Sequence, residues 1–200
     1  MKKILRQQFG QSLLEAVFAI GILLLVAGAV LALTTANVVG QSASEFQITA
    51  NNLAREAVEV VRNIRDSNWL AGNPWDQGLT DLISTTAIIV YNQGADSTVN
   101  PWQLQFNPTT AEKSVYLDTT TGLYSQLSAG GTFTGFKREL ILDSICQKVS
   151  GPTIGTETVA GSCNTADEQK VGLSVTVTVS WVERNQNRQV KLTDLLYAWK

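Results

Sequence analysis

A single carboxylate, Glu15, stands at the front of the most apolar stretch of the chain. The residues that follow it, 16–33, carry no charge. Moving an ionisable side chain into hydrocarbon costs several kcal/mol, about 2.5–3.5 on insertion scales, so a residue of this kind usually has a function. The sequence therefore predicts either a charged partner for Glu15 within the membrane or a position at the membrane surface.

The remaining chemistry of the sequence is sparse. The chain contains no histidine, which is the commonest general base and the commonest zinc ligand. It also contains no phosphate-binding loop, nucleophile elbow or metal-spaced cluster of ligands. We therefore expect no catalytic residue, no cofactor and no metal site. An enzyme that uses an Asp or Glu of the C-terminal part is the remote alternative.

Cys146 and Cys163 are the only two cysteines. If this part of the chain lies outside the cytoplasm, a disulfide between them is the expected arrangement. It would close a loop of about 18 residues and stabilise the fold by about 3 kcal/mol in the chain-entropy model. The alternative is a pair of unbonded cysteines that pack as small apolar side chains.

The charge of the chain is distributed unevenly. A net charge of −2 and an isoelectric point near 5.2 argue against a protein that binds nucleic acid by neutralising its phosphates. Lys2, Lys3 and Arg6 precede the apolar stretch, which would be roughly 27 Å long as a helix and could cross the hydrocarbon core. Because the basic side stays in the cytoplasm, we predict a single-pass membrane protein whose remainder lies outside.

Beyond residue 33 the sequence becomes amphipathic. Apolar residues recur at steps of four and three, which places one apolar stripe along a helix. The stripe consists of Phe46, Ala50, Leu53, Ala57, Val60 and Ile64. On other faces, Arg55–Glu59 and Arg62–Asp66 have the i,i+4 spacing of helical ion pairs. The hydrophobic and amphipathic segments are expected to form one helix, which the Gly-Asn-Pro sequence at 72–74 ends.

The C-terminal part has the pattern of short strands bounded by Gly, Pro, Asn or Thr. The clearest strand is GLSVTVTVSW at 172–181, where apolar residues alternate with Ser and Thr, as in an antiparallel sheet with one buried face. A polar turn at 183–188 leads to a last strand at 189–199, and Trp181 and Trp199 are expected in the core. Further strands are expected at 86–91, 102–106, 114–118, 122–127 and 136–143. The stretch between the cysteines predicts a loop. The predicted fold class is α+β, a long helix packed on a mainly antiparallel sheet.

The sequence G-QSLLE at residues 10–15, between a short basic stretch and the apolar run, resembles the cleavage and methylation motif of type IV prepilins and pseudopilins. In that family a glycine ends the leader and a glutamate is the fifth residue of the mature chain. The resemblance implies cleavage after Gly10, N-methylation of Gln11 and a role for Glu15 in the register of assembly. Phenylalanine is the most frequent residue of the family at the position of Gln11. A chain with another residue there resembles minor pilins.

The resemblance implies three parts of the chain. They are a basic leader at 1–10, a helix at 11–68 that is transmembrane at about 14–35 and amphipathic at about 42–67, and a β-rich head at 69–200. Glu15 lies one helical turn after Gln11 on about the same face, so in a filament it can meet the Gln11 ammonium of a neighbouring subunit. Removing one partner of such a buried pair costs about 3–5 kcal/mol.

The implied function is a minor pilin or pseudopilin of a type IV pilus, a competence pilus or a type II secretion pseudopilus. Its implied partners are other pilin subunits, a prepilin peptidase that also methylates, an assembly platform and the membrane, with no nucleic acid. The implied location is the bacterial cytoplasmic membrane, with the head outside, and then a cell-surface filament. The alternative is a membrane-anchored or secreted β-rich binding or adhesin domain whose ordinary leader is cut after Ala36 or remains uncut.

Overall fold

The computed structural model describes residues 9–81, 85–91, 101–119, 122–126, 131–151 and 153–198, with side chains from residue 13 onward. The chain divides into two compact units, Met1–Phe46 and Gln47–Lys200. The first unit contains the N-terminal part of one long helix, and the second contains the rest of that helix and the described strands. The fold class is α+β, as the sequence predicts. The division into leader, helix and head stays a prediction.

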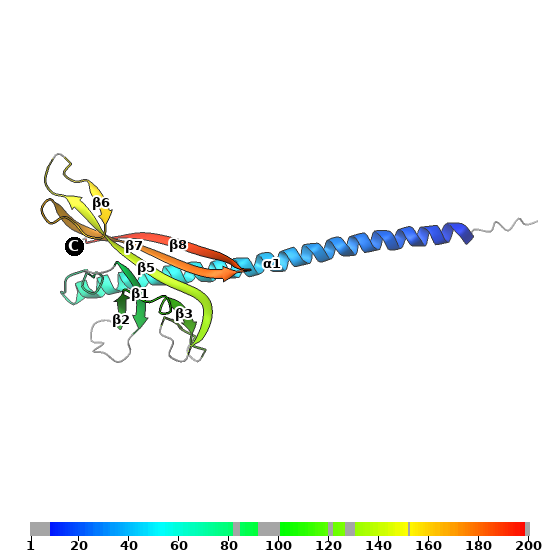
Figure 1. The fold of residues 1–200 in the computed structure, drawn as a ribbon, viewed down its shortest axis with the longest axis horizontal. Helices are drawn as coiled ribbons and strands as arrows, with labels where there is room; N and C mark the ends of the chain where they lie inside the picture. Colours follow the sequence, from blue (N-terminus) through cyan, green and yellow to red (C-terminus); the bar gives the residue numbers. More distant parts are fainter. Residues whose placement is uncertain are drawn as a thin grey trace, which may run out of the picture. The chain divides into compact units, whose positions relative to one another are not determined.

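The helix α1 extends over Phe9–Leu70 (Figure 1). It ends just before Gly72, which adopts a left-handed φ of 73° that glycine reaches without a steric penalty. The amide of Gly72 donates to Trp69 O at 3.1 Å, and that of Asn73 donates to Asn68 O at 2.9 Å. These two bonds form a Schellman cap, which satisfies carbonyl groups of the last helical turn.

The described strands form one antiparallel sheet around β5 and β7. The strands are β1 (Thr86–Tyr91), β2 (Trp102–Phe106), β3 (Ser114–Leu117), β4 (Tyr124–Ser125), β5 (Thr132–Lys148), β6 (Glu157–Ala160), β7 (Glu168–Glu183) and β8 (Gln186–Tyr197). β5 pairs with β7 along one edge and with β3, β1 and β6 in turn along the other. β8 pairs with β7 and runs beside it (Figure 1).

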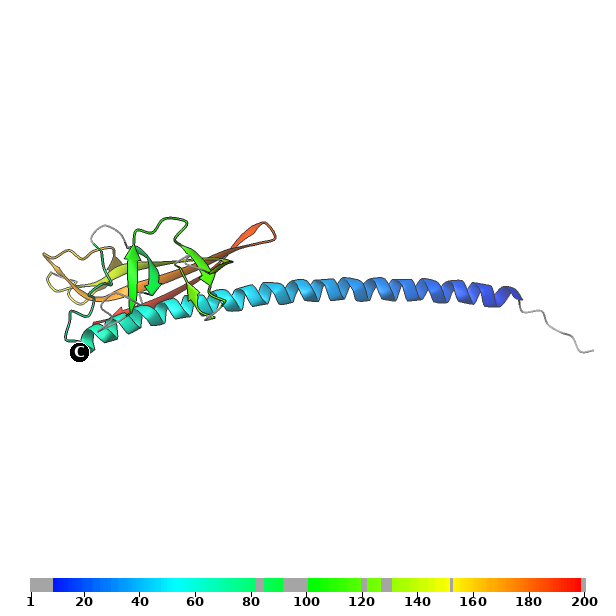
Figure 2. The same cartoon turned by 90° about the horizontal axis from the view of Figure 1, so that it is seen from below.

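The core of the second unit lies between α1 and the central strands (Figure 2). The predicted apolar stripe of α1 is buried from Ala50 to Ile64. Opposite it, the alternating residues Val175, Val177 and Val179 of β7 are fully buried. The two sequence periods, 3.6 for the helix and 2 for the strand, therefore identify the two faces that meet.

The prediction of a loop between the cysteines is wrong in part. β5 continues through Lys148, and β6 forms within the predicted loop. The register pairs Ile145 with Val159 and Cys146 with Thr158. β6 has only 4 residues, so it has no periodicity of its own and forms because β5 offers it a partner.

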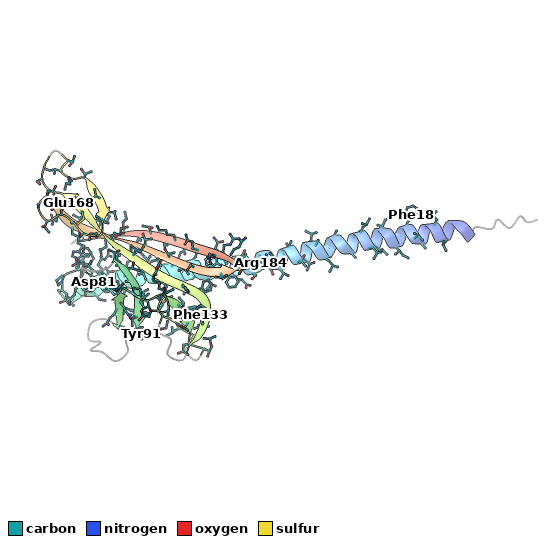
Figure 3. The ribbon with its side chains drawn as sticks, in the orientation of Figure 1. Phe18, Asp81, Tyr91, Phe133, Glu168 and Arg184 are labelled. Atoms are coloured by element: carbon teal, nitrogen blue, oxygen red, sulfur yellow. A yellow bond between two sulfur atoms is a disulfide. The ribbon has the colours of Figure 1, made fainter. Side chains whose placement is uncertain are left out.

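The turn between β7 and β8 is shorter than the predicted polar turn at 183–188. The turn consists of Arg184 and Asn185, whose φ angles of 48° and 63° lie in the left-handed region. Two-residue hairpin turns of this kind match the twist of the strands that they join, so β7 and β8 extend almost to the tip, which Arg184 marks in Figure 3. Trp181 is buried as predicted, and Trp199 lies outside the described residues.

Replacing Gly172 of β7 with alanine is expected to destabilise the head by about 1–3 kcal/mol. A Cβ atom there would lie 2.6 Å from Leu196 O, a backbone atom of β8, and 3.1 Å from Ile145 Cδ1. β8 must therefore shift to accept it. Urea unfolding of the full chain in detergent measures the loss. Gly161→Ala, whose Cβ would meet only Thr85 Cγ2 at 3.7 Å, should keep the original midpoint, and equal midpoints for the two variants would contradict the prediction.

Candidate assembly site

The candidate assembly residues lie at the start of α1. Gly10 and Gln11 are in its first turn, and Glu15 follows one turn after Gln11 with an exposed side chain. Positions 11 and 15 share a face of the helix, because residues four apart lie one above the other. The predicted leader residues 1–8 lie outside the described residues. The sites of cleavage, methylation and register therefore stay predictions.

The electrostatics of this helix start favour an acid. The N-terminal end of a helix carries roughly half a positive elementary charge. No acidic residue occupies the first turn of α1, and Glu15 is the only acid of residues 9–44. A cut after Gly10 would add the ammonium of Gln11 to this end, where a cation is unfavourable by about 0.3–1 kcal/mol. A carboxylate that contacts the ammonium offsets this repulsion.

The side chains around Glu15 are apolar and exposed. Leu14 is 60% exposed, Val17 and Phe18 are 64% exposed, and Figure 3 shows Phe18 pointing away from the helix. Over an 18-residue window no residue is buried, and the helix is long and apolar enough to cross a membrane. An exposed apolar surface of this extent marks contact with lipid or protein. The helix can therefore span a membrane once, although a signal sequence would meet the same criteria.

Cys146 and Cys163 form a disulfide, as the sequence predicts, with their Cα atoms 5.4 Å apart. The bond joins the end of β5 to the segment after β6. The alternative of two unbonded cysteines is therefore wrong. Disulfides persist in oxidising compartments, so this bond fits a head outside the cytoplasm.

A buried arginine connects α1 to the sheet. Arg138 of β5 is 1% exposed. Its Nη1 donates to Leu53 O and to Glu56 Oε2, both at 3.2 Å, and its Nε donates to Gln126 Oε1 at 3.1 Å. Burial lowers the pKa of the Arg138 guanidinium, and attraction by Glu56 opposes that shift. The buried charge is thus paired and hydrogen-bonded, as the interior of a protein requires.

Gln126 extends this network to neighbouring strands. Its side chain is buried, and its Nε2 donates to Arg138 O at 2.8 Å and to Lys113 O at 3.3 Å. Its Oε1 also accepts the amide of Ile89 at 3.2 Å. One glutamine therefore uses both its donor and its acceptor groups and joins β1, β5 and the residue before β3.

Sequence reasoning missed Arg138 as a core residue, although a signal was present. Phe136, Arg138, Leu140 and Leu142 alternate along β5, and alternate residues of a strand point to the same face. All four are buried. No comparable signal indicated Glu56, which is 82 positions away in the sequence.

The predicted i,i+4 ion pairs of α1 are wrong. Arg62 binds Glu59 on the helix and Asp194 of β8, with N–O distances of 2.7 Å for both. The hydrogen bond that Arg62 donates to Asp194 is the main cause of the raised pKa of Arg62. Asp66 pairs with the preceding arginine at 2.9 Å. Arg55 has no ion pair to any described residue. For Arg62, helical spacing gave the wrong partner because β8 supplies a carboxylate within bonding distance.

A surface hollow of about 840 Å³ lies beside the disulfide. Serine and threonine residues from several segments are among those that line it, namely Thr80, Thr85, Ser144, Ser162 and Thr165. Throughout the described part of the chain, no three His, Cys, Asp or Glu side chains come together as a metal-binding group. We assign no chemistry to this hollow.

Comparison with protein-family models, with curated proteins and with solved structures finds no match. The likeness to prepilins therefore depends on residues 10–15 and their sequence context. One long helix with an apolar N-terminal part, together with an antiparallel sheet, is compatible with a pilin architecture but does not by itself identify one.

Proposed function

We propose that this chain is a structural subunit of a helical filament, namely a minor pilin or pseudopilin of a type IV pilus, a competence pilus or a type II secretion pseudopilus. The change of environment along α1 supports this most. Side chains of its N-terminal part are apolar and exposed, whereas Leu53, Ala57 and Val61 are buried in the head. One helix thus combines an apolar lateral surface with a firm attachment to a folded domain.

An apolar helix of this kind can exchange its surroundings. In a membrane, lipid tails are as apolar as leucine, so contacts with lipid can be replaced by contacts with identical helices at a modest change in free energy. A repeated head-to-tail contact that does not close into a ring produces a filament. An assembly platform with a cytoplasmic ATPase would supply the work of extraction from lipid.

Processing would prepare the subunit for this exchange. A prepilin peptidase would cut after Gly10 and methylate the new amine of Gln11. That bond lies in the first turn of α1, and terminal turns of helices fray, so the enzyme could reach it while the rest of the helix stays formed. The Gln11 ammonium would then pair with Glu15 of an adjoining subunit. Buried ion pairs fix register better than they add stability.

Mass spectrometry of the mature N-terminus tests this proposal. The purified protein is expected to begin at N-methylated Gln11, and a Gly10→Leu variant should keep its leader. A chain that begins at Asn37 would indicate a signal peptide, and one that begins at Met1 would indicate an uncut anchor. Either result would contradict the proposal and favour a membrane-anchored or secreted β-rich binding or adhesin domain.

A further inference from the structure

β8 forms a long and regular edge of the sheet (Figure 1). It has 12 residues, pairs with β7 without a register shift, and has no described strand on its other side. Other strands at the edges of the sheet are short, with 5 residues in β2, 2 in β4 and 4 in β6. Among the side chains of β8 only Leu196 is buried, so solvent reaches this strand.

Proteins usually protect such an edge by keeping it short, by covering it, or with a proline, a bulge or charged side chains, lysine above all. β8 contains no proline, and its ladder with β7 contains no bulge. Its exposed cations, Arg188 and Lys191, have no ion-pair partner in the described chain, whereas Asp194 is bonded to Arg62. Arg188 lies opposite Trp181 and Lys191 opposite Thr178 in the ladder, so the two cations stand on opposite faces of the sheet. They are the only edge protection of this kind on β8, and they discourage cationic strands but not an acidic one.

We propose that the outer edge of β8 binds an extended acidic segment of another protein by strand addition. In this mode the main-chain hydrogen bonds supply affinity and the alternate side chains supply specificity. Acidic side chains of the segment would face Arg188 and Lys191. A second copy of this chain fits less well, because Asp194 is the only acid of β8 and already bonds Arg62, and a pairing centred on Lys191 would place two lysines opposite each other.

Synthetic peptides of the length of β8 test the proposal on the full chain in lipid nanodiscs. One fluorescent peptide alternates valine with threonine and carries two glutamates spaced to face Arg188 and Lys191, and its control carries lysines instead. We expect fluorescence anisotropy to show at least tenfold tighter binding of the acidic peptide, because the sign of cross-strand charge pairs reverses. N-methylation of alternate peptide nitrogens should abolish binding, since those nitrogens form the ladder.

Charge reversal in the protein supplies the matched control. The variant Arg188→Glu/Lys191→Glu should prefer the lysine peptide, whereas Lys137→Glu, at an exposed cation of β5, should keep the original preference. The proposal is overturned if the acidic peptide does not bind, if both peptides bind equally, or if N-methylation has no effect. Dimers of the chain alone with β8 amides protected from hydrogen exchange would also overturn it, because the occupant would be a second copy. The test does not depend on the proposed filament function.

Discussion

Replacing Glu15 with alanine is expected to leave removal of the leader intact and to reduce incorporation into filaments at least tenfold. The bond between Gly10 and Gln11 is unchanged, so the peptidase keeps its substrate. In the assembled bundle, however, the ammonium of Gln11 would remain as an unpaired charge among apolar helices, which is strongly unfavourable. Because about 1.4 kcal/mol already corresponds to a tenfold change in an equilibrium constant, the effect on assembly is expected to be large.

Two further variants make this test specific. Glu15→Gln keeps the size of the side chain and removes its charge, so it should assemble as poorly as Glu15→Ala. Glu45→Ala removes the next acid of α1, which is exposed and lies beyond the apolar part, and it should assemble normally. Immunoblots of sheared surface material measure incorporation, and mass spectrometry of the membrane fraction measures cleavage. Normal incorporation of Glu15→Ala would contradict the role assigned to this carboxylate.

The elements predicted correctly from the sequence have local signals. The end of α1 depends on Gly72, because a helix stops readily where glycine can adopt a left-handed conformation. The buried face of β7 follows from simple alternation at Val175, Val177 and Val179. The disulfide was predictable because the chain contains only two cysteines. Each of these inferences uses residues close in sequence or a residue type too rare to allow alternatives.

The features that the sequence did not predict depend on contacts between distant segments. β6 is a short strand that pairs with β5. Arg62 donates a hydrogen bond to Asp194, which is 132 positions away in the sequence. Strand propensity and helical spacing are weak predictors of a residue's partner when another element of the fold supplies a closer one. The candidate site is different again: Gly10 to Glu15 follow from a motif, but their proposed partner is a group on another subunit, which the sequence of one chain does not reveal.

The buried Arg138 network illustrates what such distant contacts contribute. A well-packed apolar residue is often as good for stability as a buried ion pair, so stability alone does not explain the arginine. Leu53 O and Glu56 Oε2 lie three residues apart on α1 and bind the same guanidinium. Sliding the helix by one turn along the sheet would separate Arg138 from both. The contact therefore selects one register for the packed part of α1.

Replacing Arg138 with alanine is expected to lower the free energy of unfolding by about 3–5 kcal/mol, because it removes a large core side chain and three hydrogen bonds from a charged donor. Arg138→Met should lose about half as much, since it fills most of the space and Glu56, 34% exposed, can be hydrated.

Urea unfolding of the full chain in detergent, followed by tryptophan fluorescence, measures both losses. Lys137→Ala, at the exposed neighbouring position, should change the free energy by no more than about 0.5 kcal/mol. Equal losses for Arg138→Ala and Lys137→Ala would contradict the structural role of the network. If Arg138→Met proves as stable as the original chain, the guanidinium contributes register and not stability, and hydrogen exchange of residues 53–56 should then reveal a helix that is less firmly positioned.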